Sequence, residues 1–183
     1  MRATGPLLST KGTAACEMIR SFGLMEFANK RVEVIFSAEE IAERITVISQ
    51  DIAQEKLHRP LVVAILKGSF VFAADLIRAL HRTGMTPEVD FITLSSYKSG
   101  TTSSGSVEIL RDIETDVTGR DVLIVDDILE SGRTLAFAKD LVSARGAQRV
   151  LTCVLLNKGV PRAVDVKADH YVFDCPAGVF VIG

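Results

Sequence analysis

Short apolar runs alternate along the chain with stretches of helical periodicity. Leu61–Leu66 and Val122–Val125 are wholly apolar and rich in β-branched residues, which is typical of strands covered on both faces. Three further segments are predicted as strands: Val32–Phe36, Val89–Leu94 and Val150–Leu156. These strands together predict a sheet with a buried centre.

The segments between these runs predict helices. Ser37 and Glu40 form a capping-box pattern that opens a helix over Ala38–Glu55. Its apolar stripe consists of Ile41, Ile45, Ile48 and Ile52. Further helices are predicted over Phe70–Leu80 and from about Leu135 to Gly146. Buried strands alternating with helices predict an α/β domain with a mainly parallel sheet, in which ligands bind at the carboxyl ends of the strands.

Composition narrows the class of protein. The chain has 183 residues, of which 48% are hydrophobic, and its net charge is −2. These values indicate one globular domain and argue against disorder and nucleic-acid binding. Three cysteines without metal-ligand spacing, Cys16, Cys153 and Cys175, favour a reducing cytosol. Because no run is long enough for a signal peptide or a membrane span, we expect a soluble, cytoplasmic protein.

The segment Val122–Thr134, VLIVDDILESGRT, carries the strongest chemical signal. Asp126 and Asp127 follow a buried strand, and a loop with Ser131 and Gly132 precedes a helix. Backbone N–H groups at such a helix start can surround a phosphate. The carboxylates would repel a phosphate, so they suit a sugar diol or Mg²⁺. Taken alone, the pair could also belong to an acidic loop that caps a helix, and neither a Walker A nor a G-x-G-x-x-G motif is present.

This segment closely resembles the phosphoribosyl-diphosphate signature of type I phosphoribosyltransferases. The collinear motifs LKGS, SSY and LLNK make the chain similar to the hypoxanthine-guanine branch, from about Val32 to Gly183. The resemblance implies a mainly parallel twisted sheet flanked by helices, with a small hood from the chain ends. Residues 31–183 would form the phosphoribosyltransferase domain, and residues 1–30 a flexible N-terminal extension with one short helix.

The resemblance implies roles in binding phosphoribosyl diphosphate (PRPP). Asp126 and Asp127 match the residues that hold the ribose hydroxyls, and through ribose or water they would also bind Mg²⁺. The loop for the 5′-phosphate matches Glu130, Ser131, Gly132, Arg133 and Thr134. Lys67 and Gly68 match the pyrophosphate loop, which in the family often has a non-proline cis peptide just before the lysine. Arg162 is expected to join Lys67 near the diphosphate.

Other residues match the family's purine site. Lys158 would donate to the 6-oxo group, although a lysine at a strand end is ordinarily just solvated. Phe180 and Val181 would stack on the base and contact it through the main chain, or simply form a core strand. Glu130 stands where the family usually has aspartate as proton acceptor near N7, so its reach differs by one methylene. Ser96 and Tyr97 match the flap that closes over the reaction centre, within a Ser/Thr/Gly-rich segment, residues 95–106.

The predicted activity is transfer of the phosphoribosyl group from PRPP to hypoxanthine or guanine, in a protein that binds no nucleic acid or membrane and forms a homodimer or homotetramer. The family normally continues past Gly183 with an aspartate that binds magnesium, so the chain resembles a shortened member. A xanthine-preferring enzyme and a non-catalytic regulator that binds PRPP or nucleotide remain alternatives.

Overall fold

The computed structural model describes residues 2–4, 25–27, 30–96 and 107–182. Its largest sheet contains β4 (Leu61–Leu66), β5 (Glu88–Ser96), β6 (Val107–Arg111), β7 (Asp121–Leu129), β8 (Arg149–Lys158) and β9 (His170–Cys175). The six strands lie in the order β6-β5-β4-β7-β8-β9. All are parallel except β6, which pairs antiparallel to β5 at one edge. This mainly parallel sheet confirms the predicted fold class.

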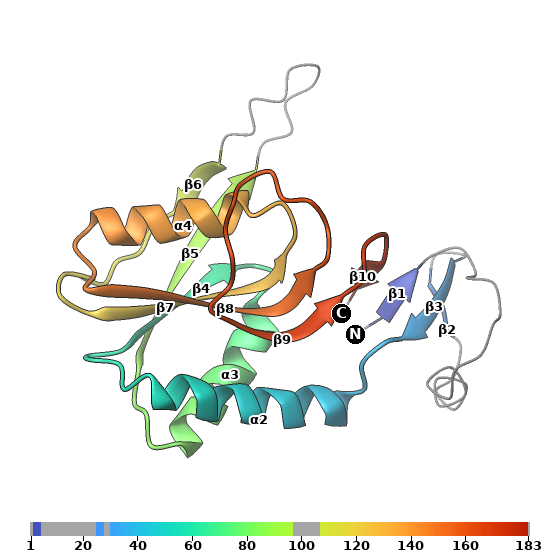
Figure 1. Cartoon of the computed structure of the whole chain (residues 1–183), viewed down its shortest axis with the longest axis horizontal. Helices are drawn as coiled ribbons and strands as arrows, with labels where there is room; N and C mark the ends of the chain where they lie inside the picture. The colour runs from blue at the N-terminus through green and yellow to red at the C-terminus, as the bar shows by residue number, and fades with distance from the viewer. Residues whose placement is uncertain (1, 5–24, 28–29, 97–106, 183) are drawn as a thin grey trace.

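Helices cover both faces of the sheet. Helices α2 (Ala38–Gln54) and α3 (Phe70–Arg82) lie on one face, and α4 (Arg133–Ala144) lies on the other (Figure 1). Along β4, Val62 and Ala64 belong to the core cluster that includes α2 and α3 residues. Leu61 and Val63 belong to the cluster that includes α4 residues. Because successive side chains of a strand point to opposite faces, the continuous apolar run follows from this double covering.

The local signals for α2 are confirmed. The Ser37 side chain accepts a hydrogen bond from the backbone N–H of Glu40 at 3.1 Å, as a helix N-cap does. Ile45, Ile48 and Ile52 are buried and form part of the core. The helix thus presents its predicted stripe to the sheet.

The chain ends form a second, four-stranded sheet. It contains β1 (Arg2–Thr4), β2 (Met25–Phe27), β3 (Lys30–Val34) and β10 (Phe180–Ile182), in the order β10-β1-β3-β2. Because β1 pairs antiparallel with β10, the two ends lie side by side (Figure 1). This arrangement is the hood of chain ends that the resemblance implies. Two of its strands, β1 and β2, fall within residues 1–30, for which no strand was predicted.

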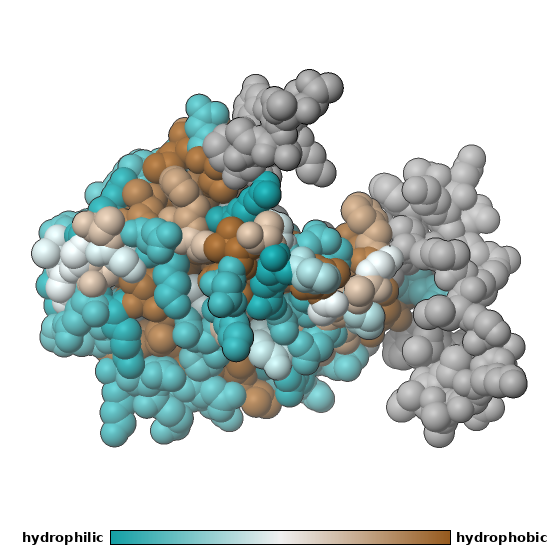
Figure 2. Space-filling model, turned by 45° about the horizontal axis from the view of Figure 1, so that its top comes forward, coloured by the Kyte–Doolittle hydropathy of each residue, from teal (hydrophilic) through white to brown (hydrophobic). Residues whose placement is uncertain are grey.

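Some expectations concern parts of the chain outside the described residues. These are the short helix expected near the N-terminus, Cys16, and the flap from Tyr97 onward. Cys153 and Cys175 are both free and buried. Hydrophobic residues on the face in Figure 2 form separate patches among polar ones. Among the described helices, none is long and apolar enough to cross a membrane.

Candidate active site

Two neighbouring carboxylates lie near the carboxyl end of β7. The strand continues to Leu129, so Asp126 and Asp127 lie within it rather than after it as predicted. Their backbone can extend the strand because β8 pairs with β7 as far as Asn157. Asp126 is buried and accepts a hydrogen bond from the Asp127 N–H at 3.0 Å. The acid pair is therefore held rigidly by the sheet.

The acid pair places two carboxyl groups side by side, with Asp126 buried and Asp127 partly exposed. Burial raises the pKa of Asp126 well above its ordinary value, and the neighbouring Asp127 carboxylate raises it further. A cation, or a pair of hydroxyl donors, would stabilise the ionised form of both groups. The arrangement is therefore chemically suited to a sugar diol or a divalent metal ion.

The loop after β4 approaches Asp127 very closely. The peptide bond Leu66–Lys67 is cis, as the resemblance implies, and Ser69 fixes the turn by donating to the Ile65 carbonyl at 2.6 Å. A Cβ added to Gly68 would lie 2.2 Å from Oδ2 of Asp127. A larger residue here would force the loop or the Asp127 carboxylate to move, so the expected pyrophosphate loop and the expected ribose-binding pair adjoin each other.

The segment from Glu130 to Thr134 connects β7 to α4. Gly132 is the N-cap of α4 and has a φ of +81°, a conformation that other residues rarely adopt. The Ser131 hydroxyl accepts a hydrogen bond from the Arg133 N–H at 3.4 Å. Because the first N–H groups of a helix have no partner within it, this loop can bind an anion as expected for the 5′-phosphate.

Lys158 and Glu130, both expected at the purine, form an ion pair. The Lys158 ammonium donates to Oε1 of Glu130 at 2.8 Å. The Lys158 side chain is only 10% exposed, whereas that of Glu130 is 54% exposed. Lys158 is the last residue of β8 rather than a residue beyond it. A buried ammonium requires a partner, so a base that takes this donor must displace Glu130 or share it.

The remaining expected residues lie in three places. Arg162 donates to the Val166 carbonyl at 2.7 Å and to Oδ1 of Asn157 at 2.5 Å. Phe180 and Val181 lie on β10, where Phe180 is 64% exposed. Ser96 ends β5. The contacts of Asn157 and Val166 were not predicted, because a tertiary hydrogen bond to an asparagine or a carbonyl leaves no sequence pattern.

The acid pair also fits magnesium. Within the described ranges, no cluster of three or more histidine, cysteine or acidic residues is present. Magnesium is commonly bound by one or two carboxylates together with water and substrate phosphates, so a complete protein cage is not required. A cation bound beside the pair would favour the ionised form of Asp126, whose pKa is raised by burial and by the neighbouring Asp127.

Comparison with known proteins agrees with this combination of fold and site. A model of the phosphoribosyl transferase domain matches residues 32–183, and the chain belongs to this family. Hypoxanthine-guanine phosphoribosyltransferase of Dictyostelium discoideum is 42% identical over 82% of this chain and 84% of its own length.

Two solved structures of the hypoxanthine phosphoribosyltransferase of Trypanosoma cruzi are similar, each with 38% identity. The complex with the product IMP has a TM-score of 0.72 and covers 79% of this chain and 80% of its own. The other concerns the role of the C-terminal region in oligomeric state and enzymatic activity. It has a TM-score of 0.74 and covers 79% of this chain and 78% of its own.

Proposed function

We propose that this protein transfers the 5-phosphoribosyl group from PRPP to N9 of hypoxanthine or guanine. The products are IMP or GMP and pyrophosphate, as in purine salvage. The observation that carries the proposal is the presence of three features near the carboxyl ends of the neighbouring strands β7 and β8. These are the acid pair, the anion-binding start of α4 and the paired Lys158 and Glu130. The relatives named above carry the same activity in their names.

Binding of PRPP follows from the chemistry of the loops. The N–H groups from Ser131 to Thr134 would bind the 5′-phosphate. Asp126 and Asp127 would accept hydrogen bonds from the ribose hydroxyls and stabilise the positive charge that develops at C1′. Lys67 and the N–H groups beside Gly68 would bind the departing pyrophosphate. Much of the rate would then come from positioning and fixed electrostatics.

In the transfer itself, N9 of the purine forms a bond to C1′ while the bond from C1′ to the pyrophosphate oxygen breaks. The pyrophosphate leaves with the electron pair of that bond, and the base loses one proton. Glu130, as a carboxylate near N7, would accept this proton. Mg²⁺ held by Asp126 and Asp127 through ribose or water would supply charge neutralisation for the leaving group.

Selection of the base depends on Lys158. An ammonium only donates hydrogen bonds, so it pairs with the 6-oxo group of hypoxanthine or guanine and not with the 6-amino group of adenine. A site with an unpaired buried donor rejects the wrong base strongly. Phe180 would stack on the base and Val181 would contact it through the main chain.

Oligomeric state and location are part of the proposal. We expect a homodimer or homotetramer in the cytoplasm. Two exposed apolar side chains at the start of α3, Phe70 and Val71, support association because they adjoin the pyrophosphate loop and lie open to solvent. Light scattering of the purified protein would measure the assembly directly.

The test is nucleotide formation from PRPP and Mg²⁺ with hypoxanthine, guanine, xanthine and adenine, each supplied separately. We expect product with hypoxanthine and guanine and none with adenine. Preference for xanthine would identify a different base specificity. Binding of PRPP without product from any base would contradict the proposed activity and indicate a binding protein on this fold.

A further inference from the structure

A segment that follows β8 holds the expected 5′-phosphate loop from outside. The carbonyl of Ser131 accepts hydrogen bonds from the N–H groups of Ala163 and Val164, at 3.0 and 3.3 Å. At Gly132, a Cβ would lie 2.6 Å from Cγ1 of Val166 and 3.0 Å from the Val164 carbonyl oxygen. The position of the loop backbone is therefore set by residues 163–166 as well as by its own turn.

Arg162 connects that segment to β8. Its Nη1 donates to the Val166 carbonyl at 2.7 Å, and its Nη2 donates to Oδ1 of Asn157 at 2.5 Å. Asn157 is fixed in turn, because its amide donates to Oδ1 of Asp174 on β9 at 2.8 Å. Asn157 precedes Lys158 in the same strand. One guanidinium thus links the segment on the phosphate loop to the strand that carries the purine lysine.

We propose that Arg162 is a positioning residue that sets the distance between the 5′-phosphate loop and Lys158. This inference rests on the proposed function, and it differs from the contact with diphosphate that the family resemblance implies for Arg162. A planar guanidinium can bridge two acceptors in a fixed geometry, which a lysine ammonium cannot reproduce. Small errors in the placement of substrate-binding groups are costly to rate, so such a link has a catalytic consequence without touching substrate.

The two roles predict different results for two substitutions. Arg162→Met keeps the aliphatic stem and removes both donors, and we expect the KM for PRPP to rise about tenfold with a smaller change in kcat. Arg162→Lys should be nearly as impaired, because the ammonium does not span Val166 and Asn157. A lysine variant with the wild-type KM would overturn the proposal and favour a charge contact with phosphate.

Arg145→Met is the matched control. Arg145 also makes two hydrogen bonds, both to Asp112, at the far end of α4 from the phosphate loop. We expect unchanged KM and kcat for this variant. Thermal unfolding of all variants separates lost stability from lost positioning. An equal rise in KM for Arg145→Met would overturn the specific role of Arg162.

A double-variant cycle tests the link to β8. If Arg162 acts through Asn157, then Arg162→Met combined with Asn157→Ala should raise KM no more than the stronger single variant, within about twofold. Multiplicative effects would contradict the link. Calorimetric binding of PRPP is measured for every variant, so the positioning role is tested even if the unsubstituted protein converts no base. Absence of product from the unsubstituted protein would instead count against the proposed function.

Discussion

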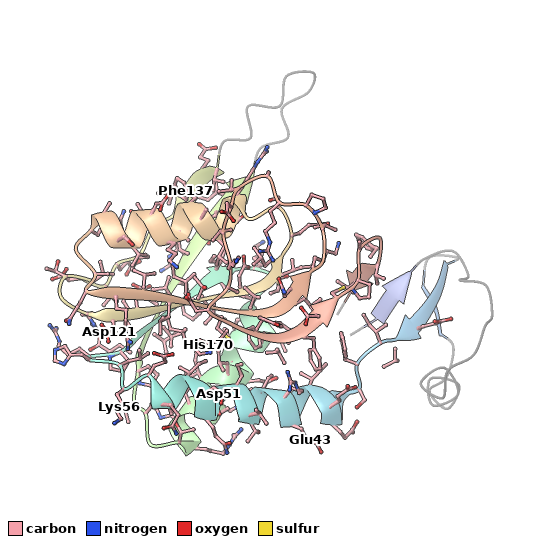
Figure 3. All side chains as sticks on the ribbon, in the orientation of Figure 1. Glu43, Asp51, Lys56, Asp121, Phe137 and His170 are labelled. Carbon is pink, nitrogen blue, oxygen red and sulfur yellow. The ribbon has the colours of Figure 1, made fainter. Side chains whose placement is uncertain are left out.

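The amino and carboxyl ends of the parallel strands differ in how their charged residues are paired. At the amino end of the sheet, where β4, β7 and β8 begin, charged side chains pair with one another and with the backbone. Arg120 is buried and donates to the Arg59 carbonyl at 3.1 Å and to Glu88 at 2.7 Å. Arg149 donates to Glu55 and to Asp121, which Figure 3 labels on the side of the sheet away from β10.

At the carboxyl end of the sheet, two acidic residues are neighbours instead. Asp126 and Asp127 are adjacent carboxylates, and neither forms an ion pair with a described residue. Lys158 has one partner, the half-exposed Glu130. The charges at the amino end are therefore paired within the fold, whereas the acid pair at the carboxyl end has no ion-pair partner among the described residues. Under the proposed function, this difference leaves the acid pair available for a ligand.

The largest effect is expected from Asp127→Asn. This change removes one charge from the acid pair while it preserves the shape of the side chain, so we expect kcat/KM for PRPP to fall about 100-fold. Binding of the purine base should change much less. The measurement is steady-state kinetics at varied PRPP, with unfolding temperature as the control for folding. Kinetics equal to those of the unsubstituted protein would contradict the ribose-binding role.

Gly68→Ala should have the next largest effect. The new methyl group would meet the Asp127 carboxylate, whose Oδ2 is 2.2 Å from the Cβ position, so the loop or the carboxylate must move. We expect at least a tenfold loss of kcat/KM for PRPP. Gly159→Ala is the matched control, because its nearest neighbour is the Cys175 carbonyl at 3.8 Å. Similar losses in both variants would contradict the view that close contact between Gly68 and Asp127 causes the effect.

The two cations at the ends of β8 provide a direct contrast. Lys158→Met should chiefly impair use of hypoxanthine and guanine, with little loss of stability. Arg149→Met should leave the kinetics unchanged and lower the free energy of unfolding by about 2 kcal/mol, because it removes hydrogen bonds to buried Asp121 and to Glu55. Urea unfolding and base kinetics on both variants test the contrast. Lost stability in Lys158→Met together with impaired kinetics in Arg149→Met would contradict the difference between the two ends of the sheet.

The smallest effects are in stability, and their signs differ. The pKa of Asp126 is raised in the folded state, so its protonated form contributes stability at low pH that is lost as pH rises through this pKa. Asp126→Asn should therefore raise the unfolding temperature at pH 8.

The Arg120 hydrogen bond lowers the pKa of Glu88, which contributes stability above its unfolded pKa that is lost in acid. Glu88→Gln should slightly lower the unfolding temperature at pH 8 and have no effect at pH 2.

Sequence pattern predicted the inner part of the fold well. Leu61–Leu66 has the predicted bounds because burial on both faces leaves an uninterrupted apolar run. The strands β6 and β9 were not predicted, because as edge strands they mix exposed charges with apolar residues. The end of β7 was placed too early, since two carboxylates interrupt the apolar pattern although the ladder continues.

The candidate site was predicted through its motifs rather than through its contacts. The resemblance named Glu130 and Lys158 separately, and only the tertiary structure brings them within 2.8 Å of each other. Arg162 could be recognised as a cation near the site, but its acceptors depend on how residues 157–166 fold over α4. The roles of these residues with substrate stay predictions.

The pairing of β1 with β10 has a consequence for synthesis on the ribosome. Arg2 lies opposite Ile182, so β1 can pair with β10 only after β10 has been synthesised. The six-stranded sheet contains no strand beyond Cys175, so its pairing does not have to wait for β10. Phe180 and Val181 lie on β10, so we expect the purine end of the site to be completed after the strands of the larger sheet have been synthesised.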